Sequence, residues 1–200
     1  MDIFFQALIS YMVIVDPAGV ALIFHALSRN QGDDYRKKMA LRAVLISFLL
    51  IIFFGFFGEW LLKSLSISLE SFKIAGGLLL FYTAFRMVVA TDQPASSDEL
   101  RAADDISVYP LSIPLLAGPG CLTLTVLLFT AQSGGVAGYL QILLAITLVF
   151  LIVLGCLLGA KAVAEVLGET GNSIMKRLLG VILAALSIQF VADGIRGFIG

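Results

Sequence analysis

From Ile106 to Ala160 the chain carries no Asp, Glu, Lys or Arg. The whole chain shows the same bias, with 60% hydrophobic and 14% charged residues among its 200. Soluble domains carry roughly 45–50% apolar and about 25% charged residues, so a soluble domain of this size cannot bury so much apolar surface. This composition, with a mean hydropathy of +1.02, predicts a polytopic membrane protein and excludes a soluble enzyme or a disordered chain.

The apolar segments are expected to be helices. Runs such as residues 44–54 do not alternate between polar and apolar side chains, as the strands of a membrane barrel do. A spanning helix needs about 20 mostly apolar residues, and a polar turn at residues 132–135 divides the uncharged stretch in two. The sequence therefore predicts an all-α protein with six spans: Ile3–Leu27, Met39–Leu62, Phe72–Ala90, Val108–Thr130, Gly138–Val163 and Ile174–Phe198.

The distribution of positive charge predicts the orientation. Most of the 13 Lys and Arg residues lie in residues 29–42, 86–101 and 161–177, at the connections that six spans would place on one side. Because Lys and Arg concentrate in cytoplasmic loops, both termini are expected outside, in the periplasm of a bacterium with two membranes. The net charge of −1 leaves no basic face for nucleic acid, and two cysteines exclude a disulfide scaffold.

The two halves of the chain resemble each other. Lys73 and Lys176 each begin a Lys-x-x-x-Gly pattern followed by an aliphatic run. Each half has three spans, an odd number, so the second half is expected to be inverted relative to the first, as in many secondary transporters. We therefore predict a repeat at 1–91, a polar cytoplasmic linker at 92–107 and an inverted repeat at 108–200. The alternative is that two apolar three-helix units look alike through composition alone.

The first span of each predicted repeat carries a break. Asp16 lies about 20 Å along the first span, near the bilayer midplane. Asp is a preferred helix N-cap and Pro fits the first helical position, so Asp16-Pro17 is expected to end one half-helix and start another. Gly118-Pro119 predicts the same break in the fourth span. An isolated Asp at this depth costs at least ~2.5–3.5 kcal/mol, so a partner, water or ligand is expected to offset it.

The two breaks differ in chemistry. Gly118 has no side chain, so the N–H groups of Gly120, Cys121 and Leu122 are expected to face an anion such as a carboxylate, whereas Asp16 suits an ammonium group. Together they would match a small zwitterion, because glycines let the backbone approach closely. The alternative is that Asp16 only caps a kinked helix. The candidate substrate-binding residues are Asp16, Gly19, Gly118, Gly120, Cys121 and Thr123, with Pro17 and Pro119 at the helix breaks and no catalytic or metal-ligating residue expected.

Glycines elsewhere in the spans have an expected structural role. Gly76, Gly77, Gly155 and Gly159 are expected to allow close contact between helices, as small residues do in membrane proteins.

Three motifs carry a resemblance to a known family. With Asp16-Pro17-Ala18-Gly19, Ala75–Phe81 continuing to Arg86-Met87, and Tyr109–Gly120, the chain resembles the MarC family, which is also classed as a neutral amino acid transporter family with SnatA-like members. The resemblance implies six helices, a bacterial or archaeal plasma membrane and, for some members, transport of glycine- or alanine-like amino acids. Val20 and Leu22 depart from the polar residue and Pro that the family often has there, which predicts a drier first half-site.

The function predicted from the sequence is a secondary transporter of small neutral amino acids in the bacterial inner membrane, working by alternating access, and not an enzyme. A channel with Asp16 in a cation filter and a regulatory membrane protein remain alternatives; a membrane enzyme ranks last. No cofactor is expected, and the choice between H⁺ and Na⁺ as coupling ion stays open. The expected partners are the lipid bilayer and a small zwitterion, and a homo-oligomer is left open.

Overall fold

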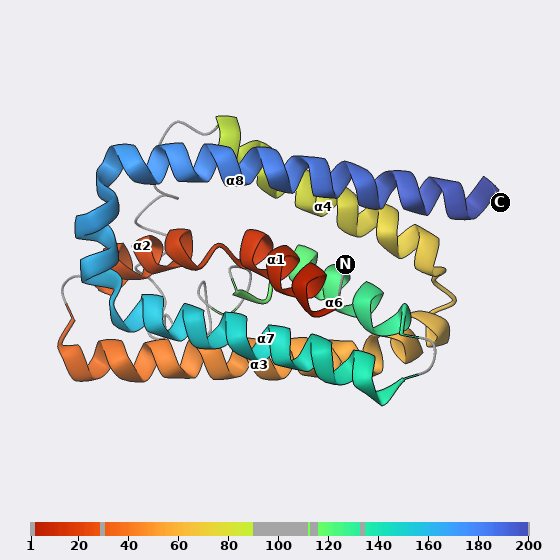
Figure 1. Cartoon of the computed structure of the whole chain (residues 1–200), viewed down its shortest axis with the longest axis horizontal. Coiled ribbons are helices and arrows are strands. Elements are labelled where there is room, and N and C mark those ends of the chain that lie inside the picture. The colour runs from red at the N-terminus through yellow and green to blue at the C-terminus, as the bar shows by residue number, and fades with distance from the viewer. Residues whose placement is uncertain (1–2, 29–30, 90–111, 113–115, 133–134, 200) are drawn as a thin grey trace.

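The computed structural model describes residues 3–28, 31–89, 112, 116–132 and 135–199, and those residues contain no strand. The predicted all-α class is therefore confirmed for this part of the chain. The predicted linker at 92–107 and most of the predicted fourth span before Leu116 lie outside the described residues. The helices are α1 (Ile3–Val15), α2 (Pro17–Ser28), α3 (Asp33–Ser64), α4 (Leu69–Val89), α6 (Pro119–Thr130), α7 (Val136–Leu158) and α8 (Ala160–Ile199), shown in Figure 1.

Within the described part of the chain, five helical segments are long and apolar enough to cross a membrane. They are Ile3–Ser28, which comprises α1 and α2, then α3, α4, α7 and residues Ser173–Ile199 of α8. The multi-pass character predicted from the sequence is thus confirmed. α6 is apolar but has only 12 residues, so the sixth span stays a prediction.

The predicted end of the fifth span at Val163 is wrong. α7 ends at Leu158, Gly159 forms a turn, and α8 begins at Ala160. Hydropathy alone does not register this turn, because Ala160, Ala162 and Val163 follow Gly159 and keep the segment mostly apolar around the single charge of Lys161. α8 then bends at Gly168, whose φ of 58° and ψ of 177° suit glycine because it has no Cβ. The bend turns α8 back along the molecule (Figure 1).

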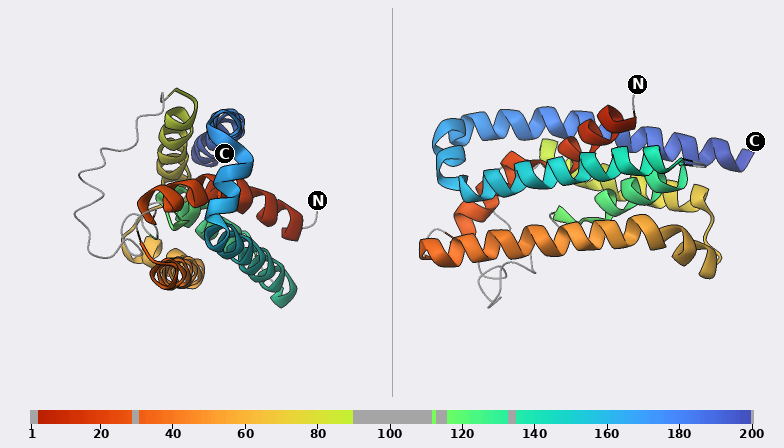
Figure 2. Two further views of the ribbon diagram at one scale, coloured as in Figure 1. Left: turned by 90° about the vertical axis from the view of Figure 1, so that its left-hand side faces the viewer. Right: turned by 60° about the horizontal axis from the view of Figure 1, so that its bottom comes forward.

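The helices form three layers. α4 and α8 pack together on one side, α3 and α7 contact each other on the other side, and α1, α2 and α6 lie between them (Figures 1 and 2). The main hydrophobic core joins the middle layer to α3 and α7, while a smaller cluster of Leu80, Ala84 and Leu183 joins α4 to α8. The interrupted pair α1–α2 and the short helix α6 therefore occupy the interior, between the longer helices.

Contacts cross between the two halves of the chain. α1 and α2, from the first half, contact α7 and α8; α6, from the second half, contacts α3 and α4. Glycines allow close approach at these contacts: a Cβ on Gly76 would overlap Thr123 of α6, and one on Gly58 would overlap Val126. The expectation for Gly155 is wrong, because a Cβ there would meet nothing within 4 Å.

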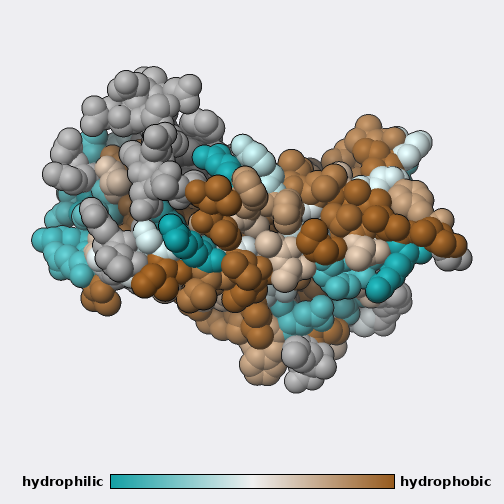
Figure 3. Space-filling view, turned by 90° about the horizontal axis from the view of Figure 1, so that it is seen from above, coloured by the Kyte–Doolittle hydropathy of each residue, from teal (hydrophilic) through white to brown (hydrophobic). Residues whose placement is uncertain are grey.

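The outer faces are apolar, as a lipid environment requires. Figure 3 shows brown side chains along much of the face formed by α4 and α8, with hydrophilic residues in smaller groups at both ends and between them. Leu78 and Phe85 of α4 and Leu178 of α8 are 57%, 53% and 61% exposed. Exposed apolar surface of this extent marks contact with lipid.

Candidate functional site

Asp16 caps the N-terminus of α2. The Gly19 N–H donates to Asp16 Oδ1 over 3.1 Å, and the Val20 N–H donates to the Asp16 carbonyl over 3.0 Å. Asp16 has a φ of +46°, a left-handed conformation that Asp tolerates better than most residues. A Cβ on Gly19 would overlap the carboxylate, so Asp16-Pro17-Ala18-Gly19 acts as one local unit. The predicted break is confirmed.

Gly118 begins α6 without a side-chain cap. Pro119 occupies the first helical position, and the Leu122 N–H donates to the Gly118 carbonyl over 3.0 Å. The predicted helix start at Gly118-Pro119 is therefore confirmed, whereas the half-helix predicted before it lies mostly outside the described residues. The expectation for the Leu122 N–H is wrong, because the first turn of the helix already uses it. This leaves the N–H groups of Gly120 and Cys121 with no hydrogen-bond partner among the described residues.

A buried hydrogen bond ties α1 to α6. The Tyr11 hydroxyl lies 2.7 Å from Thr125 Oγ1. Because Thr125 donates its own proton to the Cys121 carbonyl over 2.7 Å, Tyr11 is the donor in the pair. Tyr11 and Thr125 are both fully buried at 0% exposure, so this bond fixes the position of α1 on α6.

The Tyr11–Thr125 bond also places the two breaks at similar depth. α1 and α6 contact each other and run in opposite directions (Figure 1). From Tyr11 to Asp16 the chain advances about 7.5 Å along α1, and from Thr125 back to Gly118 it retreats about 10 Å along α6. Both displacements point the same way, so Asp16 and Gly118 differ by about one half-turn of helix in depth.

The other predicted site residues are closely packed. The Thr123 hydroxyl donates to the Pro119 carbonyl over 2.8 Å, so it is free only to accept a bond from a ligand. Cys121 is 2% exposed. Gly120 lies directly against the Leu80 side chain, which covers the uncapped end of α6 in this conformation.

Three neighbours of the breaks were not predicted from the sequence. Tyr11 and Leu80 reach this region from α1 and α4, and Lys176 of α8 interacts electrostatically with Asp16. The sequence predicts a place for Lys176 at a connection between spans, because charge alone suggests an interfacial position. The position of Tyr11, five residues before Asp16, could suggest that it lies near the first break. Its hydrogen-bond partner Thr125 lies 114 residues away in sequence, so the sequence does not reveal the bond.

Two cavities lie away from the breaks. One, of about 450 Å³, lies where α3 begins and α7 gives way to α8. A second, of about 100 Å³, lies at the other end beside Glu59, Thr130 and Tyr139. Neither is lined by a residue of the two breaks. Because Leu80 lies against Gly120, a ligand that binds the Gly120 N–H requires a more open conformation than this one.

Comparison with known proteins gives consistent similarities along the whole chain. A family model described as MarC family integral membrane protein matches residues 1–199. A UPF0056 membrane protein of Archaeoglobus fulgidus is 33% identical over 98% of this chain and 93% of its own length. One from Methanocaldococcus jannaschii is 34% identical over 98% of both chains. The UPF0056 membrane protein YvbG of Bacillus subtilis is 29% identical over 94% of this chain and 92% of its own. No solved structure matches.

Proposed function

We propose that this chain, which belongs to the MarC family of integral membrane proteins, is a secondary transporter that moves small neutral amino acids across the plasma membrane. The relatives are named only as membrane proteins, so the proposal rests on the two helix breaks. The substrate class is glycine- or alanine-like, with one ammonium and one carboxylate group.

The observation that carries the proposal is the pairing of unlike breaks at one depth. Asp16 places a carboxylate at the middle of the 26-residue segment Ile3–Ser28. The uncapped end of α6 offers the N–H groups of Gly120 and Cys121, together with the positive end of a helix dipole. A zwitterion presents the complementary charges, with its ammonium group to Asp16 and its carboxylate to α6.

The pattern of contacts supports an inverted repeat. α1 and α2 pack on α7 and α8, and α6 packs on α3 and α4. A two-fold relation between three-helix units would produce this reciprocal arrangement, since each interrupted helix contacts the second and third helices of the other unit. Transporters with inverted repeats commonly bind their substrates where interrupted helices meet.

The closed packing around α6 suggests how access would alternate. Leu80 covers Gly120, and Gly76 contacts Thr123, and both covering residues come from α4. Because α4 packs mainly on α8, we propose that this pair moves as a unit away from α6 to admit substrate. Such a movement would open the site on one side while the Tyr11–Thr125 bond keeps α1 and α6 together.

The orientation and the coupling ion are further parts of the proposal. With the basic connections in the cytoplasm, the N- and C-termini lie outside, and in a bacterium with two membranes the protein lies in the inner one. Asp16 is the group through which H⁺ or Na⁺ would couple to transport, because it is the carboxylate at the break.

Transport by purified protein in proteoliposomes tests the proposal. Radiolabelled glycine, alanine and serine are supplied with a Na⁺ gradient, a proton gradient or neither. We expect saturable uptake that is lost in Asp16→Asn, because the amide cannot balance an ammonium charge. Asp193→Asn is the matched control: Asp193 is partly exposed on α8 and pairs with Arg196, so this variant should transport normally.

Two results would contradict the proposal. Flux that rises linearly with concentration, together with ion conductance in planar bilayers, would indicate a channel. Full uptake by Asp16→Asn would remove the ammonium-binding role of this carboxylate.

A further inference from the structure

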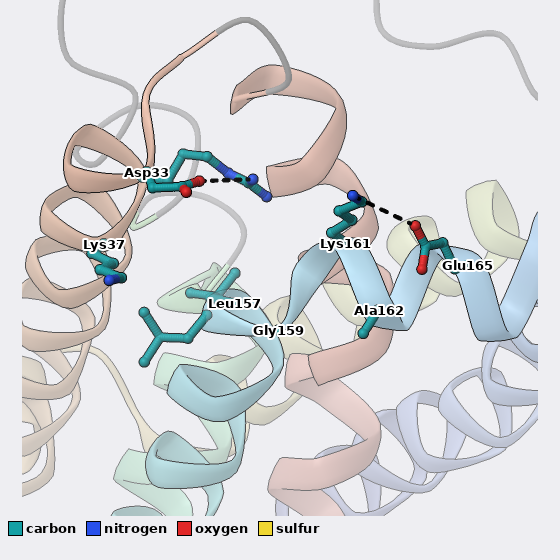
Figure 4. A pocket seen from close by; sticks show the side chains of 9 residues that line it. Asp33, Lys37, Leu157, Gly159, Lys161, Ala162 and Glu165 are labelled. Carbon is teal, nitrogen blue, oxygen red and sulfur yellow. Dashed lines mark ion pairs between the residues drawn. The ribbon is translucent and has the colours of Figure 1, made fainter.

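The larger cavity has no part in the proposed transport site. It measures about 450 Å³ and lies where α3 begins, beside the turn between α7 and α8 (Figure 4). Its lining combines charged side chains from two helices with an apolar wall from α7. The lining residues are Asp33, Arg36, Lys37, Leu157, Leu158, Gly159, Lys161, Ala162 and Glu165.

Positive charge is in excess in this cavity. Among the described residues that line it, three are basic (Arg36, Lys37 and Lys161) and two are acidic (Asp33 and Glu165). The two ion pairs are long: Arg36 lies 3.8 Å from Asp33, and Lys161 lies 3.9 Å from Glu165, so neither is within hydrogen-bonding distance. Figure 4 shows these pairs as separate dashed lines, with Lys161 and Asp33 on different helices.

A contrasting pair at the opposite end shows that short ion pairs do form in this protein. Lys63 lies 2.6 Å from Glu59, one turn away on α3, which is the length of a strong charge-assisted hydrogen bond. The long pairs in the cavity therefore leave the Arg36 and Lys161 donors available to another acceptor.

Arg36 gives a second, independent indication of a ligand. Its side chain is only 19% exposed, and its Nε is buried with no hydrogen-bond partner in the described part of the chain. A buried donor without an acceptor is unfavourable. Phosphate oxygens suit the fork of a guanidinium group, because two N–H groups of the planar guanidinium can donate in parallel to two oxygens of the anion.

The surroundings of the cavity favour a lipid as the source of the phosphate. Lys37 is followed one and two turns along α3 by Leu41 and Leu45, which are 58% and 55% exposed. Leu158, on the cavity wall, is 53% exposed. An apolar strip thus leads from the basic cavity along the outside of α3, toward the middle of the apolar span.

We propose that this cavity binds the phosphate of an anionic lipid headgroup, with the acyl chains lying along Leu41, Leu45 and Leu158. Basic pockets between membrane helices on the cytoplasmic side bind anionic headgroups in this way. The lipid would hold the start of α3 beside the turn at Gly159, and so fix the end of the molecule where α7 meets α8.

Native mass spectrometry of the purified protein in neutral detergent tests this proposal. Phosphatidylglycerol and phosphatidylcholine with identical acyl chains are titrated separately, and inorganic phosphate is a third titrant. We expect phosphatidylglycerol to bind preferentially, and Arg36→Gln and Lys161→Gln each to weaken its binding about fivefold. Lys63→Gln removes a cation from the other end and should leave binding unchanged.

Two further measurements keep the test independent of folding. The Lys161 side chain is 73% exposed, so Lys161→Gln should keep the wild-type unfolding temperature even if Arg36→Gln does not. Arg36→Lys keeps the positive charge but loses the forked pair of donors. It should bind phosphatidylglycerol more weakly than wild type yet more tightly than Arg36→Gln.

Two kinds of result would overturn the proposal. The first is equal binding of phosphatidylcholine and phosphatidylglycerol, or unchanged phosphatidylglycerol binding in Lys161→Gln. The second is inorganic phosphate that binds as tightly as phosphatidylglycerol, which would identify a free anion as the occupant and overturn the lipid assignment.

Discussion

Asp16 has two separable roles, as a structural cap and as a charge. It accepts the Gly19 N–H bond and holds a φ of +46°, and Asn satisfies both of these requirements as Asp does. Ala satisfies neither, since it loses the cap and lacks the short polar side chain whose local hydrogen bonding makes the left-handed region tolerable for Asp and Asn. The structural role therefore depends on the shape of the side chain, and the proposed binding role depends on its charge.

The stabilities of two variants at Asp16 should separate the structural role from the charge. We expect Asp16→Asn to unfold at nearly the wild-type temperature in detergent. Asp16→Ala should lose about 2 kcal/mol, from a lost cap of about 1 kcal/mol and left-handed strain of about 1 kcal/mol. Thermal unfolding followed by circular dichroism measures the difference. Equal stability of the two variants would show that Asp16 is not a cap in the protein in solution.

The Tyr11–Thr125 bond predicts an asymmetry between two substitutions. Thr125→Val leaves the buried Tyr11 O–H without an acceptor and should cost about 1–3 kcal/mol, whereas Tyr11→Phe removes that donor and should cost about 1 kcal/mol. The double variant should be less destabilised than the sum of the two. Denaturant unfolding of wild type, the two single variants and the double variant gives the free energies of unfolding for this double-mutant cycle. Additive effects would mean that the two hydroxyls do not interact.

At the scale of helices, contact between α4 and α8 depends on glycine. A Cβ on Gly77 would lie 2.8 Å from the Ser187 carbonyl oxygen of α8, a backbone atom that cannot rotate away. Gly155 of α7 is a matched control, because a Cβ there would meet nothing within 4 Å. Comparing Gly→Ala at the two positions therefore separates the effect of helix packing on stability from the intrinsic preference of Ala for helix.

We expect Gly77→Ala to destabilise the protein by about 1–3 kcal/mol, as overpacking does. Gly155→Ala should be neutral or stabilising by up to about 1 kcal/mol, since Ala favours helix more than Gly. Unfolding temperatures in one detergent make the comparison. A Gly155→Ala variant that is less stable than Gly77→Ala would contradict the described packing of α4 on α8.

The sequence predicted the elements whose cause is local. The breaks at Asp16 and Gly118 follow from cap chemistry within four residues, so they could be found without knowing what packs around them. The end of α7 at Leu158 is not evident from the sequence, because the residues after Gly159, up to Val163, are apolar apart from Lys161. The covering of Gly120 by Leu80 was missed because it depends on how α4 packs against α6, and no local pattern specifies that contact.

At the scale of the whole molecule, the helix directions place the α3–α4 connection and the C-terminus at one end. The starts of α3 and α8 lie at the other end (Figure 1). The basic residues Arg36, Lys37 and Lys161 lie at that second end. With the positive-inside rule, this arrangement predicts which connections face the cytoplasm.

Cysteine labelling in intact cells tests that orientation. In a background carrying Cys121→Ala and Cys156→Ala, we expect Lys63→Cys to react with a membrane-impermeant maleimide. Lys37→Cys should react only after the membrane is permeabilised. The reverse pattern would invert the orientation and place the basic cavity outside the cell.

The most direct test of the central claim, that two unlike helix breaks form one zwitterion site, is equilibrium binding of radiolabelled alanine to purified protein with competing analogues. We expect unlabelled alanine and glycine to compete, while propionate, which lacks the ammonium group, and ethylamine, which lacks the carboxylate, compete at least about tenfold more weakly. Alanine binding that ethylamine or propionate blocks as well as alanine does, or that persists unchanged in Asp16→Asn, would contradict the account.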